Sequence, residues 1–363
     1  MSVSIGNIAL YMGPTPLGAP DDLEPVIVDF IDKAAKTLVV AVQELESVAI
    51  ADALLRAKAR KVNVRVILES LYLTEAKPVA DPWSLKGEFM ENRRILDALL
   101  AGALEVRMDL NPATFHQKFM ARDVEGSKPA VLTGSANFTP TDMGDPNAVG
   151  KNLNHVVVIQ GKRVAEVYQE EFEELWTGTF GELQERRDPK PKEVHLSEVR
   201  VKVLFAPDHA PEMEIMKQMM KAKSRVDFAM FTFTYSSGIN DAMCVLDRSG
   251  KPVRGILDRG QGNQKWAATV PLKTGGAEIY LVKQGAPVRK LHHKLMVIDE
   301  QLIIAGSFNY TEPANMLNDE NIVVIGDLEE PASNKDAIKN QKTLAKYALA
   351  EIDRMITAYG APA

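Results

Sequence analysis

Cysteine is almost absent from the sequence, with Cys244 as the only one among 363 residues. A single cysteine excludes an intramolecular disulfide and a cysteine-rich zinc site, and it is typical of proteins from a reducing compartment. The N-terminal segment also lacks a cationic region ahead of an apolar one, and no run approaches the roughly 20 apolar residues that span a bilayer. These absences lead us to expect a cytoplasmic protein.

Positive charge is also in short supply. The 43 lysines and arginines stand against 49 aspartates and glutamates, which gives a formal net charge of -6. The molecule as a whole therefore lacks the basic character of many nucleic-acid-binding proteins, and a phosphate-rich ligand would need a local basic patch. Basic residues do cluster at 56–65, 186–192 and 283–294. Taken singly, such clusters are more often solvated surfaces than binding sites.

The chain contains an internal repeat. IALYMGP at 8–14 resembles VKVLFAP at 201–207, and each precedes apolar residues at helical spacing. Strand-like apolar segments then follow in the same order in both halves, at 36–45 and 62–70 and at 224–234 and 251–259. Strands that alternate with helices predict an α/β unit with a mainly parallel or mixed sheet, used twice.

A polar segment with two prolines, at 184–198, separates the two halves. We predict a first unit over 1–183, a linker over 184–199 and a second unit over 200–363. The periodic apolar residues of 334–358 predict a C-terminal helix docked on the second half.

Both halves carry the same motif, an HxKx4D pattern followed by GSxN. The motif residues are His116, Lys118, Asp123, Ser135 and Asn137 in the first half, and His292, Lys294, Asp299, Ser307 and Asn309 in the second. One HxKx4D pattern arises by chance in roughly 2% of chains of this length, and two arise in well under 0.1%. The repeated order makes coincidence untenable. The other four histidines are expected to be structural or solvent-exposed.

These residue types suit phosphoryl transfer. Imidazole titrates near neutral pH, so in a facing pair one ring can attack phosphorus while the other donates a proton to the leaving oxygen. Lysine ammonium groups and asparagine amides can stabilise charge on the nonbridging oxygens, and the serines can bond to phosphate or orient their neighbours. Such a set requires no metal ion and no other cofactor.

The paired motifs resemble those of the phospholipase D superfamily, and the resemblance spans nearly the whole chain. It implies an α/β fold of two tandem α-β-α sandwich units, related by a pseudo-two-fold axis, whose motifs form one active site. A monomer would then be a complete enzyme. The resemblance also implies that His116 is the nucleophile, which forms a phosphohistidine, and that His292 is the acid, which later activates water.

The resemblance assigns roles to four further residues. Glu320, in NDENIVVI, stands at the position of the family's histidine-orienting carboxylate, so it would face His116 across the halves and raise its basicity. The first half has Asn154 at the equivalent position, and an amide would orient the second histidine without holding it protonated. Asp123 and Asp299 are expected to brace the fold rather than touch substrate.

The substrate class follows from weaker signals. GSFNYT followed by NDEN resembles the nuclease-type branch of the superfamily, whereas lipid-acting members more often carry GSxNxxxRS, and no arginine-serine pair follows Asn137 or Asn309. No clear membrane-binding segment is present apart from the C-terminal helix. The leading hypothesis is a metal-independent phosphodiesterase that hydrolyses DNA or RNA. The alternatives are a phospholipase D or phosphatidyltransferase acting on phospholipid, and a non-catalytic binding protein.

Overall fold

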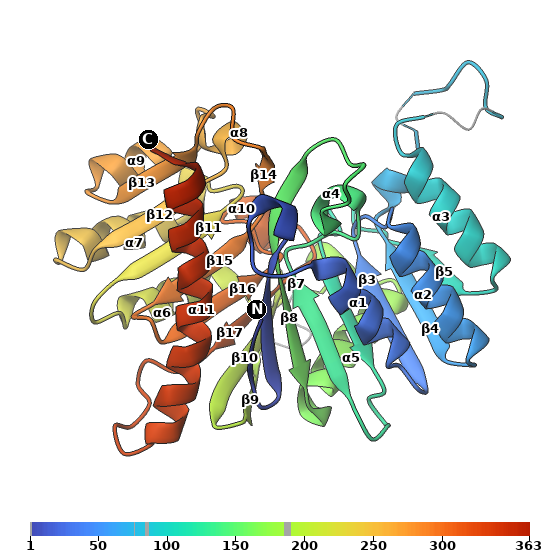
Figure 1. Cartoon of the computed structure of the whole chain (residues 1–363), viewed down its shortest axis with the longest axis horizontal. Coiled ribbons are helices and arrows are strands. Elements are labelled where there is room, and N and C mark those ends of the chain that lie inside the picture. The colour runs from blue at the N-terminus through green and yellow to red at the C-terminus, as the bar shows by residue number, and fades with distance from the viewer. Residues whose placement is uncertain (1, 76, 84–86, 185–189) are drawn as a thin grey trace.

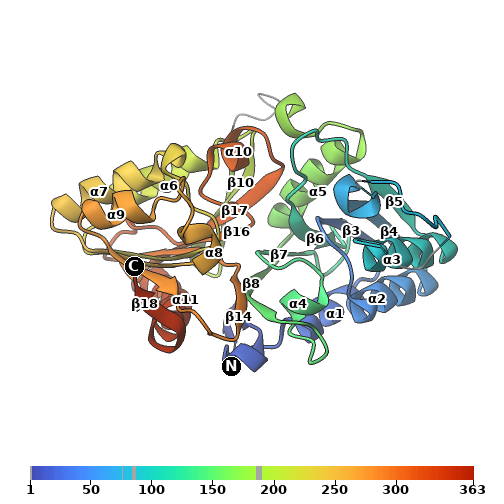
Figure 2. The same cartoon turned by 90° about the horizontal axis from the view of Figure 1, so that it is seen from above.

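The computed structural model describes residues 2–75, 77–83, 87–184 and 190–363, and it contains two mixed β-sheets flanked by helices (Figures 1 and 2). Each half of the chain builds one sheet, and eight strands of one sheet follow the same spatial order as eight strands of the other. The duplicated α/β architecture predicted from the repeat is therefore confirmed.

The first sheet has its central strands where the apolar runs predict them. Its order is β1 (Val3–Ile5), β2 (Ile8–Gly13), β8 (Lys151–Gln160), β7 (Ala130–Gly134), β6 (Lys118–Arg122), β3 (Thr37–Val42), β4 (Asn63–Leu68) and β5 (Glu105–Met108). Strands β3, β4 and β5 run parallel, and the other pairs in this order are antiparallel.

The second sheet repeats this arrangement strand for strand and adds one further strand at one edge. Its order is β18 (Gly360–Pro362), β13 (Glu278–Val282), β12 (Val253–Leu257), β11 (Val226–Met230), β15 (Lys294–Ile298), β16 (Leu302–Gly306), β17 (Glu320–Ile325), β10 (Val199–Ala206) and β9 (Lys192–Leu196). A further strand, β14 (Val288–Leu291), leaves the second half and pairs in parallel with β8 of the first sheet.

Helices cover both faces of each sheet. The helices of the first half are α1 (Leu23–Asp32), α2 (Val48–Ala59), α3 (Met90–Ala101), α4 (Pro140–Met143) and α5 (Lys162–Trp176). Those of the second half are α6 (Pro211–Met220), α7 (Ile239–Arg248), α8 (Arg259–Gly262), α9 (Thr269–Thr274), α10 (Glu312–Met316) and α11 (Lys335–Tyr359). Short 3-10 turns occupy Thr15–Leu17, Ser70–Leu73, Gly181–Leu183 and Tyr235–Ser237.

Side chains alternate between the two faces of a strand, and this divides the core. Leu38 and Val40 of β3 pack with α1, α2 and α3, whereas Val39 and Ala41 point into a core that also contains residues of α5, α11 and the second sheet. A third core lies between the second sheet and α6, α7 and α9. The central core is thus shared by both halves.

Two segments differ in detail from the sequence-based expectations. Part of the expected linker, Lys192–Leu196, forms β9, which pairs with β10, while residues 185–189 lie outside the described part of the chain. Helix α11 packs on the second sheet and also reaches the first half, where the Arg354 guanidinium and the Tyr359 hydroxyl both donate to the Leu17 carbonyl at 2.8 Å. Among the described helices, none combines the length and apolar character needed to cross a membrane.

Candidate active site

The two histidine motifs lie at the starts of equivalent strands. Each motif lysine is the first residue of a fully buried strand, β6 or β15. The backbone amide of His116 donates to the carbonyl of Asp319 (2.9 Å), and that of His292 donates to the carbonyl of Leu153 (2.9 Å). Because each histidine is bonded to the backbone of the opposite half, both motifs meet where the two sheets adjoin.

Each GSxN segment follows a strand, β7 or β16, where two backbones approach closely. A Cβ atom on Gly134 would lie 2.2 Å from the carbonyl oxygen of His155, and one on Gly306 would lie 2.2 Å from that of Asn321. Only glycine permits this approach. The backbone amides of the serines that follow donate to the same carbonyls, at 3.1 and 3.0 Å.

His116 contacts a carboxylate of the opposite half. Its Nδ1 lies 2.7 Å from Oε2 of Glu320, which also accepts from the Ser307 hydroxyl at 2.6 Å. Oε1 of Glu320 accepts from the Asn318 amide at 3.3 Å. A proton on Nδ1, directed at the carboxylate, leaves the lone pair of Nε2 free. This is the arrangement that a nucleophilic imidazole requires.

His292 has the equivalent contact, with an amide in place of the carboxylate. Its Nδ1 lies 3.0 Å from Oδ1 of Asn154, which also accepts from the Ser135 hydroxyl at 2.9 Å. The amide oxygen orients the ring through a hydrogen bond but brings no charge. The geometry is therefore two-fold, while the electrostatics of the two histidines differ.

Burial governs the protonation of this site. It lowers the pKa of His116 and His292 well below the usual histidine range, and the nearby Lys118 and Lys294 lower them further. Burial also raises the pKa of Glu320 to about 8 and lowers the pKa of Lys118 to about 8. The pKa of Lys294 is lowered well below its usual value by burial and by Lys118. An anionic phosphate would oppose the lowering for the lysines and for a protonated histidine.

The asparagines and lysines of the motifs occupy different positions around the site. The Lys118 ammonium donates to the Gln43 amide oxygen at 3.1 Å, and the Lys294 ammonium donates to the His292 carbonyl at 2.9 Å. Asn137 lines the cavity described below, and its amide nitrogen donates to Glu44 at 2.6 Å. Asn309 is half-buried and does not line that cavity; its side-chain oxygen accepts from the Thr232 backbone amide at 3.3 Å.

The motif aspartates lie at the far ends of strands β6 and β15, away from the histidines. Asp123 accepts from the backbone amides of residues 35–37, at 2.7 to 3.2 Å. Asp299 accepts from the backbone amides of residues 223–225, at 2.6 to 2.9 Å. These hydrogen bonds lower the pKa of Asp299 against the effect of its burial. Both carboxylates fix the turns that enter β3 and β11.

A second pair of histidines lies buried beside the motif pair. The rings of His155 and His293 are parallel within 9°, and their Nδ1 atoms are 3.1 Å apart. The Gly306 backbone amide donates to Nε2 of His155 at 3.1 Å, and Nε2 of His293 lies 3.8 Å from Glu351 of α11. His155 and His293 thus have a structural role, as expected, and they connect the two halves.

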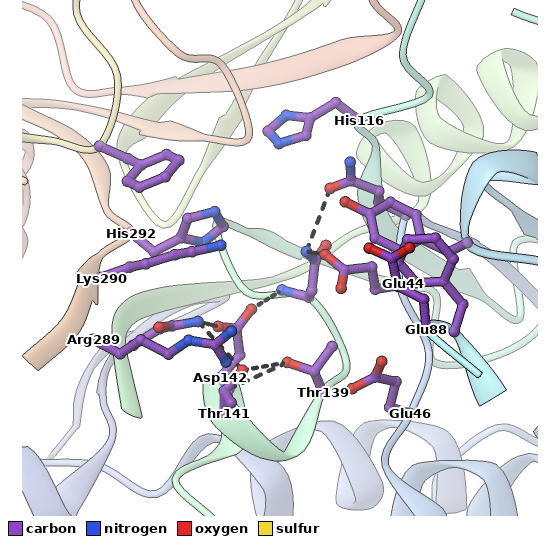
Figure 3. A pocket seen from close by; sticks show the side chains of 16 residues that line it. Glu44, Glu46, Glu88, His116, Thr139, Thr141, Asp142, Arg289, Lys290 and His292 are labelled. Carbon is purple, nitrogen blue, oxygen red and sulfur yellow. Dashed lines mark hydrogen bonds between the residues drawn. The ribbon is translucent and has the colours of Figure 1, made fainter. Parts of the chain in front are cut away.

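A cavity of about 420 Å³ opens over His116 and His292 (Figure 3). In Figure 3, three carboxylates, Glu44, Glu46 and Glu88, lie on one side of it, while Arg289, Lys290 and His292 lie on the other. The lining residues are Gln43, Glu44, Glu46, Tyr72, Glu88, Phe89, His116, Asn137, Thr139, Thr141, Asp142, Asn152, Phe231, Arg289, Lys290 and His292.

The motif analysis missed the walls of this cavity. Glu44 and Glu46 follow directly after β3, at the carboxyl end of a strand in a parallel pair, where ligand-binding residues are common. Their place after an apolar run was a usable signal. Glu88, Arg289 and Lys290 come from loops or a strand that only the folded chain brings together, and no short pattern marks them.

Comparison with known families agrees with this geometry. The family model described as cardiolipin synthase, PLD-like domain, matches residues 27–176 and 215–341, which include both motifs. The chain belongs to the phospholipase D superfamily. As a member, it is a phosphodiesterase, and the resemblance drawn from its two HxKx4D and GSxN motifs is confirmed.

Individual relatives cover parts of this phospholipase D-like chain. A mitochondrial cardiolipin hydrolase of Chlamydomonas reinhardtii is 32% identical over 106 residues, which are 29% of this chain and 46% of that protein. A phospholipase D of Rickettsia bellii is 27% identical over 163 residues, 44% of this chain and 79% of that protein. The solved phosphatidylserine synthase of Haemophilus influenzae aligns with the whole chain and 88% of its own, with a TM-score of 0.67 and 13% identity, and so supports the fold.

Proposed function

We propose that the chain hydrolyses or transfers the phosphate ester of a phospholipid head group, through a phosphohistidine on His116. The observation that carries this choice of substrate is the acidic side of the cavity, where Glu44, Glu46 and Glu88 lie near the histidines. A nucleic acid strand needs a basic groove that follows its backbone, and carboxylates disfavour a polyanion. A lipid head group brings a single phosphate to the site.

The names of the relatives favour the same choice, since they describe a cardiolipin hydrolase and a phospholipase D. We therefore rank phospholipid above nucleic acid, which reverses the ranking taken from GSFNYT and NDEN. Nucleic acid is the second candidate because Arg289 and Lys290 bring positive charge to the opposite side of the cavity. A purely binding role is the weakest candidate, because both motifs keep every reactive side chain.

The first chemical step follows from the contacts of the two histidines. Nε2 of His116 attacks phosphorus, and the bond from phosphorus to the alcohol oxygen breaks. His292, protonated when the anionic substrate enters, gives its Nε2 proton to that oxygen. Glu320 stabilises the positive charge that develops on His116. Lys118 and Asn137 offer positive charge and an amide donor to the nonbridging oxygens.

The second step regenerates the enzyme. Neutral His292 now takes a proton from water, or from an acceptor alcohol, as its oxygen attacks phosphorus. The bond from phosphorus to Nε2 breaks, so that His116 returns to its neutral form with its Nδ1 proton directed at Glu320. Water as the attacking group gives hydrolysis, and an alcohol gives transfer. The step uses no group other than these side chains.

The test is turnover of defined substrates in the presence of EDTA. Short-chain phosphatidylcholine, cardiolipin vesicles, and single- and double-stranded DNA and RNA are incubated with the wild-type chain and with His116→Ala. We expect lipid turnover that survives EDTA and falls by roughly 10³-fold or more in the variant. With His292→Ala and a p-nitrophenyl diester, whose leaving group needs no proton, the acid-labile phosphoryl group should accumulate on a peptide that contains His116, as measured by mass spectrometry.

Each result bears on a different part of the proposal. Cleavage of nucleic acid alone would overturn the choice of lipid while leaving the histidine chemistry in place. Lipid turnover that is unchanged in His116→Ala would overturn the mechanism. Loss of activity in EDTA, restored by a divalent cation, would overturn its independence of metal.

A further inference from the structure

The acidic side of the cavity belongs to one half of the molecule only. Glu44 and Glu46 lie two and four residues after Val42, whose partner across the sheet is Lys118. In the second half the equivalent partner of Lys294 is Met230. Counting from these strand ends, threonines 232 and 234 stand where the first half has glutamates. The carboxylates are therefore a departure from the two-fold pattern and are not required by the shared chemistry.

These carboxylates form no salt bridge within the described part of the chain. No salt bridge there involves Glu44, Glu46 or Glu88, although twenty others are formed. Arg289 and Lys290 lie on the opposite side of the cavity in Figure 3. Asn137 donates to Glu44 and Asn92 donates to Glu46, and the cations act on these two carboxylates only through space. A cationic ligand is therefore free to pair directly with this side.

Two buried carbonyl groups in the same cavity also lack partners. Oδ1 of Asn137 and Oδ1 of Asn152 accept no hydrogen bond, although the two side chains are only 4% and 5% exposed. Both residues line the cavity. Unpaired buried acceptors are costly and call for donors that the free protein does not supply. The partial negative charges of these two oxygens add to the negative potential around the cavity.

Aromatic rings complete the acidic side. Tyr72 and Phe89 line the cavity and meet edge to face, with ring centroids 5.0 Å apart. Carboxylates, carbonyl oxygens and aromatic faces are the three groups that proteins use to bind ammonium ions.

We propose that the side formed by Glu44, Glu46, Glu88, Tyr72 and Phe89 binds the ammonium group of an amino alcohol esterified to the substrate phosphate. The inference rests on the proposed action on phospholipid, and it narrows the head group to a cationic one, with a primary or a quaternary ammonium. The phosphate lies between the histidines, and the ammonium lies next to it on the side of the first half.

Glu44 couples this ammonium site to the phosphate site. Its Oε1 accepts from the amide of Asn137, which is the motif asparagine that lines the cavity. Burial, with Asp142 and Glu46 nearby, raises the pKa of Glu44 to about 7, against the opposing effect of Lys118 and Lys290. Protonation removes the charge, so preference for a cationic head group should weaken as the pH falls below about 7.

The experiment measures kcat/KM for dibutyroyl phosphatidylcholine, phosphatidylethanolamine and phosphatidylglycerol, all below their micelle concentrations. For the wild-type chain we expect the two cationic head groups to exceed the neutral glycerol head group by about tenfold or more. In Glu46→Gln and Glu88→Gln this ratio should fall towards one. Glu125→Gln, which removes an exposed carboxylate paired with Lys162 far from the cavity, should keep the wild-type ratio.

The outcomes separate this inference from the proposed function. Equal turnover of phosphatidylglycerol and phosphatidylcholine by the wild-type chain, or an unchanged ratio in both glutamate variants, overturns the ammonium site and leaves the lipid activity standing. Turnover of none of the three lipids, together with cleavage of nucleic acid, overturns the proposed function itself. A ratio that falls in both variants, and falls again between pH 8 and pH 6 in the wild type, supports the site.

Discussion

At the scale of single residues, the two motif histidines differ in one contact. Glu320 faces His116, and Asn154 faces His292, at similar distances and with a serine hydroxyl bonded to each. An imidazole that attacks phosphorus becomes positively charged, and a carboxylate stabilises that charge whereas an amide oxygen offers only a dipole. The contact therefore favours His116 as the attacking ring.

Replacement of Glu320 by glutamine tests this assignment. Glutamine keeps a hydrogen-bonding oxygen but removes the charge, so we expect the rate of phosphoenzyme formation to fall by roughly 10²- to 10⁴-fold. Rapid-quench measurement of the phosphorylated His116 peptide gives this rate. Asn154→Asp is the matched change on the other side, and it should leave that first attack less affected than Glu320→Gln does. A larger loss in Asn154→Asp would reverse the roles of the histidines.

The pH dependence of activity should report Lys118. Burial lowers its pKa to about 8, so the ammonium loses its proton, and with it the charge offered to phosphate, as the pH rises through about 8. We expect kcat/KM on a soluble diester to decline above this pH. Lys118→Arg, which stays protonated, should move the decline to higher pH even if it lowers the maximum. If the decline of kcat/KM at alkaline pH does not move in Lys118→Arg, it reports the titration of another group.

The motif residues could be predicted because phosphoryl transfer by histidine fixes both the residue types and their short spacing. The two lysines, two histidines and Glu320 needed no structure to be found. The cavity walls could not be predicted in the same way. Glu44 and Glu88 are 44 residues apart in the chain, and they line one cavity with Lys290 only because β14 carries the second half across to the first sheet.

At the scale of secondary structure elements, two buried networks connect strands with the covering helices. In one, His155 and His293 bond to each other and approach Glu351 of α11. At the equivalent positions of the other half, the Asn321 amide donates to the Gln117 oxygen at 2.6 Å. The Gln117 amide in turn donates to Glu171 of α5 at 3.4 Å. The equivalent connection is thus made by two imidazoles, His155 and His293, in one case and by two amides, Asn321 and Gln117, in the other.

The hydrogen bonds of His155 and His293 fix the tautomers of the two rings. Nε2 of His155 accepts from Gly306, so its proton is on Nδ1, which donates to Nδ1 of His293. The proton of His293 is then on Nε2, directed at Glu351. Both rings are neutral in this arrangement, in agreement with burial lowering the pKa of each. A further proton would break the contact between the rings.

Asn321 and Gln117 are the equivalents of His155 and His293 in the other half. They suggest a matched double replacement, His155→Asn with His293→Gln. Because the folded pKa of each histidine lies below its unfolded value, the unfolded chain binds more protons in acid, and stability is lost as the pH falls below about 6.5. Lys294 and Arg354 add to this effect, and Glu351 opposes it. We expect the free energy of unfolding to fall less between pH 7.5 and pH 5.5 in the double variant than in wild type. Urea denaturation at the two pH values measures this, and an equal fall would refute it.

The central strands were predictable because their apolar runs are long and continuous. Strand β3, TLVVAV, is buried on both faces, and this is the pattern of a strand covered on both sides. Strands β9 and β14 were not predicted. β9 alternates polar and partly buried residues at a sheet edge, and β14 is defined by pairing with β8 of the other half, which local sequence does not encode.

At the scale of the whole molecule, the halves share one core. Phe205 of β10 packs on Tyr168 of α5, with ring centroids 5.2 Å apart, and on Phe119 of β6 at 6.3 Å. All three rings are almost fully buried in the central cluster. A core of this kind couples the stability of the two halves, so we expect them to unfold together.

Phe205→Ala tests this coupling. Loss of the ring should lower the free energy of unfolding by about 3–5 kcal/mol, because the apolar surface of the ring is no longer buried and a cavity is left in the core. Trp176 reports on the first half and Trp266 on the second, so single-tryptophan versions allow the halves to be followed separately by fluorescence in urea. Both midpoints should shift equally. Separate midpoints would mean independent units, and Met213→Ala, at a 63% exposed position, should leave both unchanged.

The unequal walls of the cavity have a consequence for the orientation in which a diester enters. Between two identical walls, as in a symmetric dimer, a diester could bind either way round, and each histidine would attack in half of the encounters. Here Glu44 and Glu46 stand opposite Lys290 and Arg289, whose own two-fold counterparts are uncharged. On this basis only one direction of entry is favourable. After a gene duplication, one half of the chain can change without the other, so the site can become asymmetric. In a homodimer every substitution appears in both subunits, so the site stays symmetric.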